Sequence, residues 1–72
     1  MGIDAREIGQ RIKALRKERG FTQEEFAEAI NMTVSTISKI EVGNRVPSID
    51  TFVVLNEYFG VTLDYLVLGK AH

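Results

Sequence analysis

The feature that most constrains this chain is a pattern of helix starts that recurs five times along its 72 residues. Each start has a residue whose side-chain oxygen can accept hydrogen bonds from the free amides of a first helical turn. These residues are Asp4, Thr22, Thr33, Ser48 and Thr62. An apolar residue stands directly before each of them and another stands four positions after it, which is the spacing of a hydrophobic staple. The pattern predicts five helices, and no alternation typical of strands competes with it.

Glycines mark most of the predicted helix ends. A helix commonly ends at a residue in the left-handed conformation, which glycine adopts without steric cost. Such glycines follow helical stretches at Gly20, Gly43, Gly60 and Gly69. Starts and ends together predict helices over residues 5–19, 23–30, 34–41, 49–59 and 63–67. A capping box is predicted at Asp4 and at Thr22, because a glutamate lies three residues after each of them.

The predicted core follows from the helical spacing of the apolar residues. It comprises Ile8, Ile12, Leu15, Phe26, Ala27, Ile30, Ile37, Ile40, Phe52, Leu55, Phe59, Leu63 and Leu66. A chain of 72 residues is long enough for only one such core. The sequence therefore predicts an all-α fold, a compact five-helix bundle that forms a single domain over residues 1–72.

Composition excludes several classes of protein. With 44% hydrophobic and 26% charged residues, the chain is typical of a soluble globular domain rather than of a disordered segment. It has no cysteine, which excludes disulfides and thiolate zinc sites and suits a reducing cytoplasm. Its longest apolar runs are far too short to span a bilayer. We therefore expect a cytoplasmic protein that needs no membrane, metal or cofactor.

The net charge of -1 disfavours nucleic-acid binding, for which a basic domain is typical. The distribution of charge weakens this argument, because basic residues gather in the first predicted helix while most acidic residues lie elsewhere. The basic residues are Arg11, Lys13, Arg16, Lys17 and Arg19. The net charge alone therefore does not decide between binding partners.

The most distinctive stretch is 23–41, where two short predicted helices are separated only by a tight turn around Asn31. Asparagine tolerates the positive φ that such a turn needs. Two steeply crossing helices need a small residue at their contact, and Ala27 is well placed for it. Ile37 and Ile40 are expected to hold the second helix against the core. Its outer face then carries Val34, Ser35, Ser38 and Lys39.

Five segments of the chain, taken in order, resemble the Cro/C1-type helix-turn-helix family, also called the XRE family, which includes the phage repressors. The segments are 8–20, 21–27, 35–41, 43–48 and 58–66, so that the resemblance covers almost the whole chain. It implies a lambda-repressor-like bundle whose third helix lies in the major groove of double-stranded DNA. The implied function is sequence-specific DNA binding by a transcriptional regulator, in the first instance a repressor.

The resemblance places one face of the third helix against base edges, with Val34, Ser35 and Lys39 as the main candidates and Ser38 as a lesser one. Lys39 can donate to O6 and N7 of guanine, and Ser35 can hydrogen-bond with most bases. Val34 offers an apolar surface to a thymine methyl. Relatives often carry long amides here, so no known operator sequence transfers to this chain. The local alternatives are that Val34 only packs at the helix start and that Lys39 is only a solvated lysine.

The resemblance also implies contacts with the DNA backbone. The candidates are Gln23, Thr33, Asn44 and Arg45. Gln23 opens the second helix, where side chain and free amides face a phosphate in the family. Asn44 and Arg45 lie in the loop after the third helix. The alternatives are again local: Gln23 as a helix-start residue, Thr33 as a cap only, and Arg45 as a surface charge.

Arg16 and Glu41 match two positions that the family usually joins in a partly buried ion pair. The implied role of the pair is to fix how the third helix sits on the rest of the domain. Arg16 is also a candidate for a phosphate contact. Buried ion pairs are weak evidence for net stability. We therefore expect the pair to matter mainly because it fixes the position of the third helix.

A dimer is a further expectation by analogy with the phage repressors, which associate through the loop after the third helix and through the last two helices. The candidates for a two-fold interface are Val46, Val54, Tyr58 and Leu66. Such a dimer places two third helices about 34 Å apart and implies a palindromic operator. Scattered apolar surface residues are also normal in monomers.

Asn56 stands where relatives often have alanine, so a buried amide there needs a hydrogen-bond partner.

The residues present argue against an enzyme. The only histidine is His72, at the end of the chain, and it has no neighbours suited to a metal site. No glycine-rich phosphate loop is present, and adjacent acids such as Glu24 and Glu25 point in different directions on a helix. The serious alternative to DNA binding is a protein-interaction module, or an antitoxin-like component, with the same fold.

Overall fold

A computed structural model describes residues 3–70, and every regular element in this part of the chain is a helix. The helices are α1 (Ala5–Glu18), α2 (Gln23–Ala29), α3 (Val34–Glu41), α4 (Ile49–Phe59) and α5 (Leu63–Leu68). The predicted all-α, five-helix fold is confirmed, and the predicted bounds differ by one residue at three helix ends. No helix within residues 3–70 has the length and apolar character needed to cross a membrane. His72 lies outside the described residues.

All five helices start at the predicted capping residues, and each cap accepts a hydrogen bond from a first-turn amide. At Thr22 the capping box is complete, because the Glu25 carboxylate also accepts from the Thr22 backbone N–H. At Asp4 the capping box prediction is wrong. The Asp4 carboxylate accepts from the first-turn amides, but Glu7 pairs with Arg11 one turn further on instead of turning back to the cap.

The turn between α2 and α3 is short because two backbone hydrogen bonds close the end of α2. The N–H of Asn31 donates to the carbonyl of Glu28, and the N–H of Met32 donates to the carbonyl of Ala27. This is the Schellman arrangement, which needs a left-handed residue at its centre. Asn31 occupies that position with φ of 58°, as the sequence predicts. Thr33 then caps α3 only two residues later, so the chain turns between the helices without a flexible loop.

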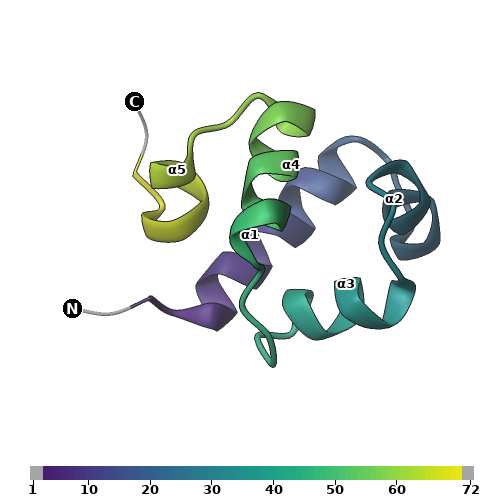
Figure 1. Cartoon of the computed structure of the whole chain (residues 1–72), viewed down its shortest axis with the longest axis horizontal. Coiled ribbons are helices and arrows are strands. Elements are labelled where there is room, and N and C mark those ends of the chain that lie inside the picture. Colours follow the sequence, from purple (N-terminus) through teal and green to yellow (C-terminus); the bar gives the residue numbers. More distant parts are fainter. Residues whose placement is uncertain (1–2, 71–72) are drawn as a thin grey trace.

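Helix α1 runs through the middle of the molecule, with α2 and α3 to one side of it and α5 to the other (Figure 1). Helix α4 crosses in front of α1 in this view. Helices α1 and α3 approach each other closely at Gly9, a buried residue of α1 that lies against the backbone carbonyls of Ile40 and Glu41 at the end of α3. Helix α1 is therefore the support on which the last turn of α3 rests.

The core contains Ile8, Ile12, Phe26, Ala27, Ile30, Ile37, Ile40, Phe52, Leu55 and Leu66, and all ten are among the predicted core residues. The predicted Leu15 and Phe59 are partly buried against this cluster. The prediction for Leu63 is wrong, because its side chain is 45% exposed. Helix α5 turns Leu66 and the half-buried Tyr65 and Val67 toward the bundle, and Leu63, in the first turn, falls at the rim.

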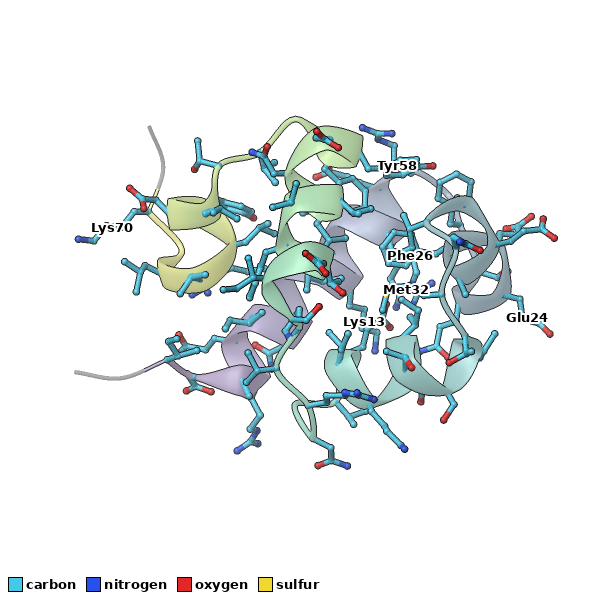
Figure 2. The ribbon with its side chains drawn as sticks, viewed as in Figure 1. Lys13, Glu24, Phe26, Met32, Tyr58 and Lys70 are labelled. Carbon is cyan, nitrogen blue, oxygen red and sulfur yellow. The ribbon has the colours of Figure 1, made fainter. Side chains whose placement is uncertain are left out.

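The side-chain view shows the same division between inside and outside (Figure 2). Phe26 is fully buried, whereas Glu24 on the same helix projects away from the body of the molecule. Asn56 is half-buried, and its side-chain amide donates to the carbonyl of Val61. The hydrogen-bond partner that this amide needs is therefore a backbone carbonyl in the turn between α4 and α5.

Candidate nucleic-acid interface

Helix α3 presents two different faces. Its inner face carries Ile37 and Ile40, each only 2% exposed, and they hold the helix on the core. On the opposite face Val34 is 39% exposed, and Ser35 and Lys39 are also exposed. The structure thus brings the three main candidates for base contacts onto one accessible surface. The lesser candidate, Ser38, is half-buried at its edge.

The dimensions of α3 suit a major groove. An α-helix with its side chains is about 10–12 Å across, and the major groove of B-DNA is about 12 Å wide. The side chains on its accessible face are short or flexible, so the helix backbone can approach the base edges closely.

The cap of α3 limits what the Thr33 hydroxyl can do. Its Oγ1 accepts from the backbone N–H of Thr36 at 3.1 Å and donates to Thr36 Oγ1 at 2.9 Å. The hydroxyl is therefore engaged as a donor and as an acceptor within the first turn of α3. This geometry favours the local alternative for the Thr33 side chain and leaves its backbone as the group available to a phosphate.

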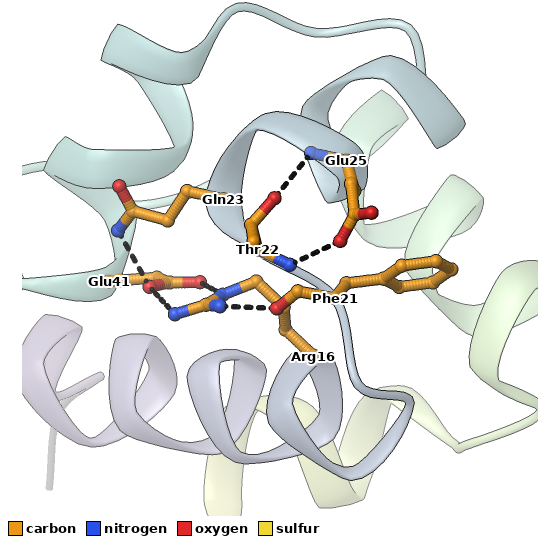
Figure 3. Close-up of polar contacts among 6 residues, drawn as sticks. All are labelled: Arg16, Phe21, Thr22, Gln23, Glu25 and Glu41. Atoms are coloured by element: carbon orange, nitrogen blue, oxygen red, sulfur yellow. Dashed lines mark hydrogen bonds and ion pairs between the residues drawn. The ribbon is translucent and has the colours of Figure 1, made fainter.

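Arg16 and Glu41 form a buried ion pair between α1 and α3 (Figure 3). Arg16 Nε donates to Glu41 Oε2 at 2.7 Å, and Arg16 Nη2 donates to Glu41 Oε1 at 3.1 Å. The side chains are only 8% and 2% exposed. A bidentate pair of this kind fixes direction as well as distance, so it sets the orientation of the last turn of α3 against α1.

The burial of Arg16 argues against its predicted phosphate contact. Besides Glu41, Arg16 binds the carbonyl of Phe21 through Nη1 at 2.6 Å, and the whole residue is 7% exposed. A guanidinium with three hydrogen bonds inside the protein presents too little surface to a ligand outside it. The role that the structure supports for Arg16 is therefore that of the buried partner of Glu41 and not of a phosphate contact.

Gln23 is also part of this network, which the sequence did not reveal. Its Nε2 donates to Glu41 Oε1 at 3.0 Å (Figure 3), while its side chain remains half-buried rather than enclosed. Glu41 therefore accepts three hydrogen bonds from two helices. The two residues are 18 positions apart, and no local pattern relates residues at that separation.

The other backbone candidates lie where α3 ends. The N–H of Asn44 donates to the carbonyl of Lys39 at 2.9 Å, and the N–H of Gly43 donates to the carbonyl of Ile40 at 3.1 Å. Gly43 has φ of 86° and lies directly against the backbone of Arg6, so the path of the chain here is closely constrained. Asn44 and Arg45 are exposed in the loop that follows.

The candidate residues for a dimer differ in how exposed their side chains are. Val46 is 45% and Val54 is 37% exposed, whereas Tyr58 is half-buried under the guanidinium of Arg19. The prediction for Leu66 is wrong, because it is fully buried in the core and presents no surface to a second molecule. Ile49, at the start of α4, is 80% exposed and was not predicted as part of this surface.

Two adjoining surface pockets lie between the helix-turn-helix and the first half of α4. They share Met32 and Thr51; one extends to Val46 and the other to Val54. Val46 of the loop and Val54 of α4 therefore each line one of these two pockets. Within residues 3–70, no group of three or more His, Cys, Asp or Glu side chains is placed to hold a metal ion.

Comparison with known proteins also identifies the region around α2 and α3 as a helix-turn-helix. A family model described as Helix-turn-helix (HTH_3) matches residues 12–66. The chain is 50% identical over 46 residues to the uncharacterized HTH-type transcriptional regulator YazB of Bacillus subtilis (strain 168), which is 64% of this chain and 67% of YazB. It is 40% identical over 63 residues to the HTH-type transcriptional regulator ImmR of the same strain, which is 88% of this chain and 49% of ImmR.

A phage protein shows a similar relation. The chain is 38% identical over 60 residues to the immunity repressor protein of Bacillus phage phi105, which is 83% of this chain and 42% of the repressor. The aligned part is thus less than half the length of ImmR and of the phage repressor. The family model covers more than half of the present chain, including α2 and α3 and the turn that joins them. The chain therefore belongs to the helix-turn-helix family of the Cro/C1 type, as its sequence predicts.

Proposed function

We propose that this protein binds double-stranded DNA in a sequence-specific manner, with α3 in the major groove, and regulates transcription as a repressor in the cytoplasm. The observation that carries the proposal is the accessible face of α3, where Val34, Ser35 and Lys39 stand together on a helix held rigidly by the core. The names of ImmR and of the phage immunity repressor support regulation and repression, respectively.

Each residue of this face has a distinct role in the proposal. Lys39 donates to guanine, Val34 contacts a thymine methyl, and Ser35 and Ser38 bind base edges as donors or acceptors. Gln23 and Arg45 contact phosphates and set the register on the duplex, together with Asn44 and the backbone of Thr33. Since Arg45 is the one cation among these backbone contacts, it is the residue expected to contribute to counterion release there.

The experiment that tests the proposal is selection from a random pool of double-stranded DNA at low salt, followed by titration of the selected duplex at rising salt. Enrichment of a defined sequence, with affinity that falls steeply as salt rises, is the expected result. The absence of any enriched sequence and of any salt-sensitive binding would exclude this function and favour the protein-interaction alternative.

Replacing Lys39 by alanine should lower affinity for the selected duplex by about 1–3 kcal/mol, because a lysine–guanine contact is lost. Discrimination at one base pair of each half-site should be lost at the same time, which selection with the variant measures directly. Lys70 is the matched control, since Figure 2 shows it projecting from the opposite end of the molecule from α3. Equal effects of Lys39→Ala and Lys70→Ala would contradict base reading by Lys39.

We further propose that the protein binds DNA as a homodimer. The interface assigned to it comprises the loop after α3 and the outer side of α4, with Val46, Ile49 and Val54 as its apolar residues. Two observations support this proposal: Val46 and Val54 line the pockets between α4 and the helix-turn-helix, and Ile49, at the start of α4, is 80% exposed. A two-fold axis through this surface pairs two α3 helices on a palindromic operator, with half-sites about 34 Å apart.

A glutamate in place of Val54 should therefore shift the protein to monomers, because two carboxylates would meet near the axis of the interface. Sedimentation with the selected duplex should then show one copy bound where the unchanged chain shows two, and affinity for the palindrome should fall while half-site affinity remains. Ile3→Glu is the control, since Ile3 is 60% exposed but lies outside this surface. If the unchanged chain sediments on DNA as a single copy, the dimer proposal is wrong.

A further inference from the structure

Glu41 binds the Gln23 side chain as well as Arg16, whose charge neutralises it. Its Oε1 accepts from Gln23 Nε2 at 3.0 Å as well as from Arg16 Nη2 at 3.1 Å. Gln23 is the first residue of α2, and Glu41 is the last residue of α3. One buried carboxylate therefore connects the start of the first helix of the helix-turn-helix to the end of the second.

The chemistry of this contact determines which way the Gln23 amide faces. An ionised carboxylate only accepts hydrogen bonds, so the edge of the amide that faces Glu41 must be its NH2 group. Figure 3 shows Nε2 directed at Glu41 and Oε1 directed away from it. One N–H of Nε2 is used on Glu41, and the second N–H is left for an acceptor elsewhere.

The positive charge of Arg16 allows the Glu41 carboxylate to lie near DNA, which is a polyanion. A carboxylate without a compensating charge would repel DNA phosphates at this end of α2. The bidentate pair with Arg16 makes the buried unit neutral, and the half-buried Gln23 side chain rests on that unit. The amide is thus held by an anion whose charge is already balanced within the protein.

We propose that Glu41 is a positioning residue for DNA binding, which holds the Gln23 amide so that its second N–H meets a backbone phosphate. The inference rests on the proposed function, because it assigns how one contact of that interface is prepared. A side chain that is already held loses less conformational freedom when DNA binds than a free one does. The same N–H···O⁻ hydrogen bond therefore contributes more to affinity when Glu41 is in place.

The test begins with Gln23→Met, which removes the amide and keeps the length of the side chain. On the selected duplex, titrated by fluorescence anisotropy at fixed salt, we expect a loss of affinity of about tenfold, since the hydrogen bond is made to a charged group. The slope of log affinity against log salt should not change, because neither side chain is charged. Gln10→Met is the matched control, since Gln10 is exposed on α1, and it should leave affinity unchanged.

The second step repeats Gln23→Met in the double variant Arg16→Met/Glu41→Met. Replacing both partners of a buried ion pair by apolar residues commonly preserves the fold, which circular dichroism verifies. In this background Gln23→Met should cost less than about threefold in affinity, because the amide is no longer held. An equal loss in both backgrounds overturns the proposal, since Gln23 would then bind phosphate without Glu41. No loss in the unchanged background also overturns it and leaves Gln23 as a ligand of Glu41 alone.

NMR of the unchanged chain gives an independent readout if the double variant does not fold. One of the two Gln23 side-chain amide protons should be protected from exchange with water in the free protein, and the other should shift when the duplex is added. Two freely exchanging protons, or no shift with DNA, would overturn the proposal. Failure of the proposed function itself is distinguishable, because the unchanged chain would then bind no duplex in the initial selection.

Discussion

Replacing Glu41 by alanine is expected to lower the free energy of unfolding by about 3–5 kcal/mol, because it leaves a buried guanidinium without a counter-charge. Arg16 is 7% exposed and would retain only its hydrogen bond to the Phe21 carbonyl. A domain of this length has a total stability of about 4–11 kcal/mol, so the variant should lose a large part of it. Urea denaturation followed by circular dichroism measures the change.

Glu7 provides the matched control for this substitution. It also pairs with an arginine, Arg11, at 3.2 Å, but its side chain is 60% exposed. Solvent screens such a pair, so Glu7→Ala should cost less than about 1 kcal/mol. The double variant Arg16→Met/Glu41→Met should recover most of the stability that Glu41→Ala loses, because no buried charge remains unpaired. If Glu7→Ala and Glu41→Ala were equally mild, the pair with Arg16 would not be desolvated as the structure has it.

The second large effect is expected at Gly9. In an exposed helix, alanine in place of glycine adds about 1 kcal/mol of stability through helix propensity. At Gly9 the added Cβ would overlap the carbonyl oxygen of Ile40 and would lie 2.8 Å from that of Glu41. Both obstacles are backbone atoms of α3, which cannot rotate away. Overpacking of this kind costs up to about 3 kcal/mol, so we expect a net destabilisation of about 2 kcal/mol.

The same substitution should also weaken DNA binding, because α3 can accommodate the new methyl group only by moving off α1. Denaturation midpoints and titration with the selected duplex measure the two effects. Ala14→Gly is the control, since Ala14 is exposed within α1 and its replacement should cost about 1 kcal/mol without changing affinity for DNA. A Gly9→Ala variant more stable than the unchanged chain would show that α1 and α3 are not in contact at this point.

The location of the helices could be predicted from the sequence because their starts and ends depend on neighbours in the chain. A cap such as Thr33 binds an amide three residues away, and Asn31 adopts its left-handed conformation within a single turn. The face of α3 that carries Ser35 and Lys39 follows from the helical period in the same way. These expectations needed no knowledge of how the helices cross.

The polar contacts between helices were harder to predict. Resemblance to a family suggested that Arg16 and Glu41 form a pair, but it did not show that the pair is too buried for Arg16 to reach a phosphate. The contact of Gln23 with Glu41 was missed altogether, although Gln23 itself was a candidate. The hydrophobic pattern likewise placed Leu63 in the core, where the short α5 leaves it at the rim.

By itself, then, the sequence determined the five helices, ten of the core residues and the outward face of α3, since each depends on spacing along one segment. Only the tertiary structure decided which residues meet across segments. Gly9 supports the end of α3, and Arg11 binds the carbonyls of Leu66 and Val67 at the end of α5 across more than fifty residues of sequence. The physical reason is that such contacts depend on the angles and distances at which helices cross, and those are set by the packing of the whole core rather than by any local pattern.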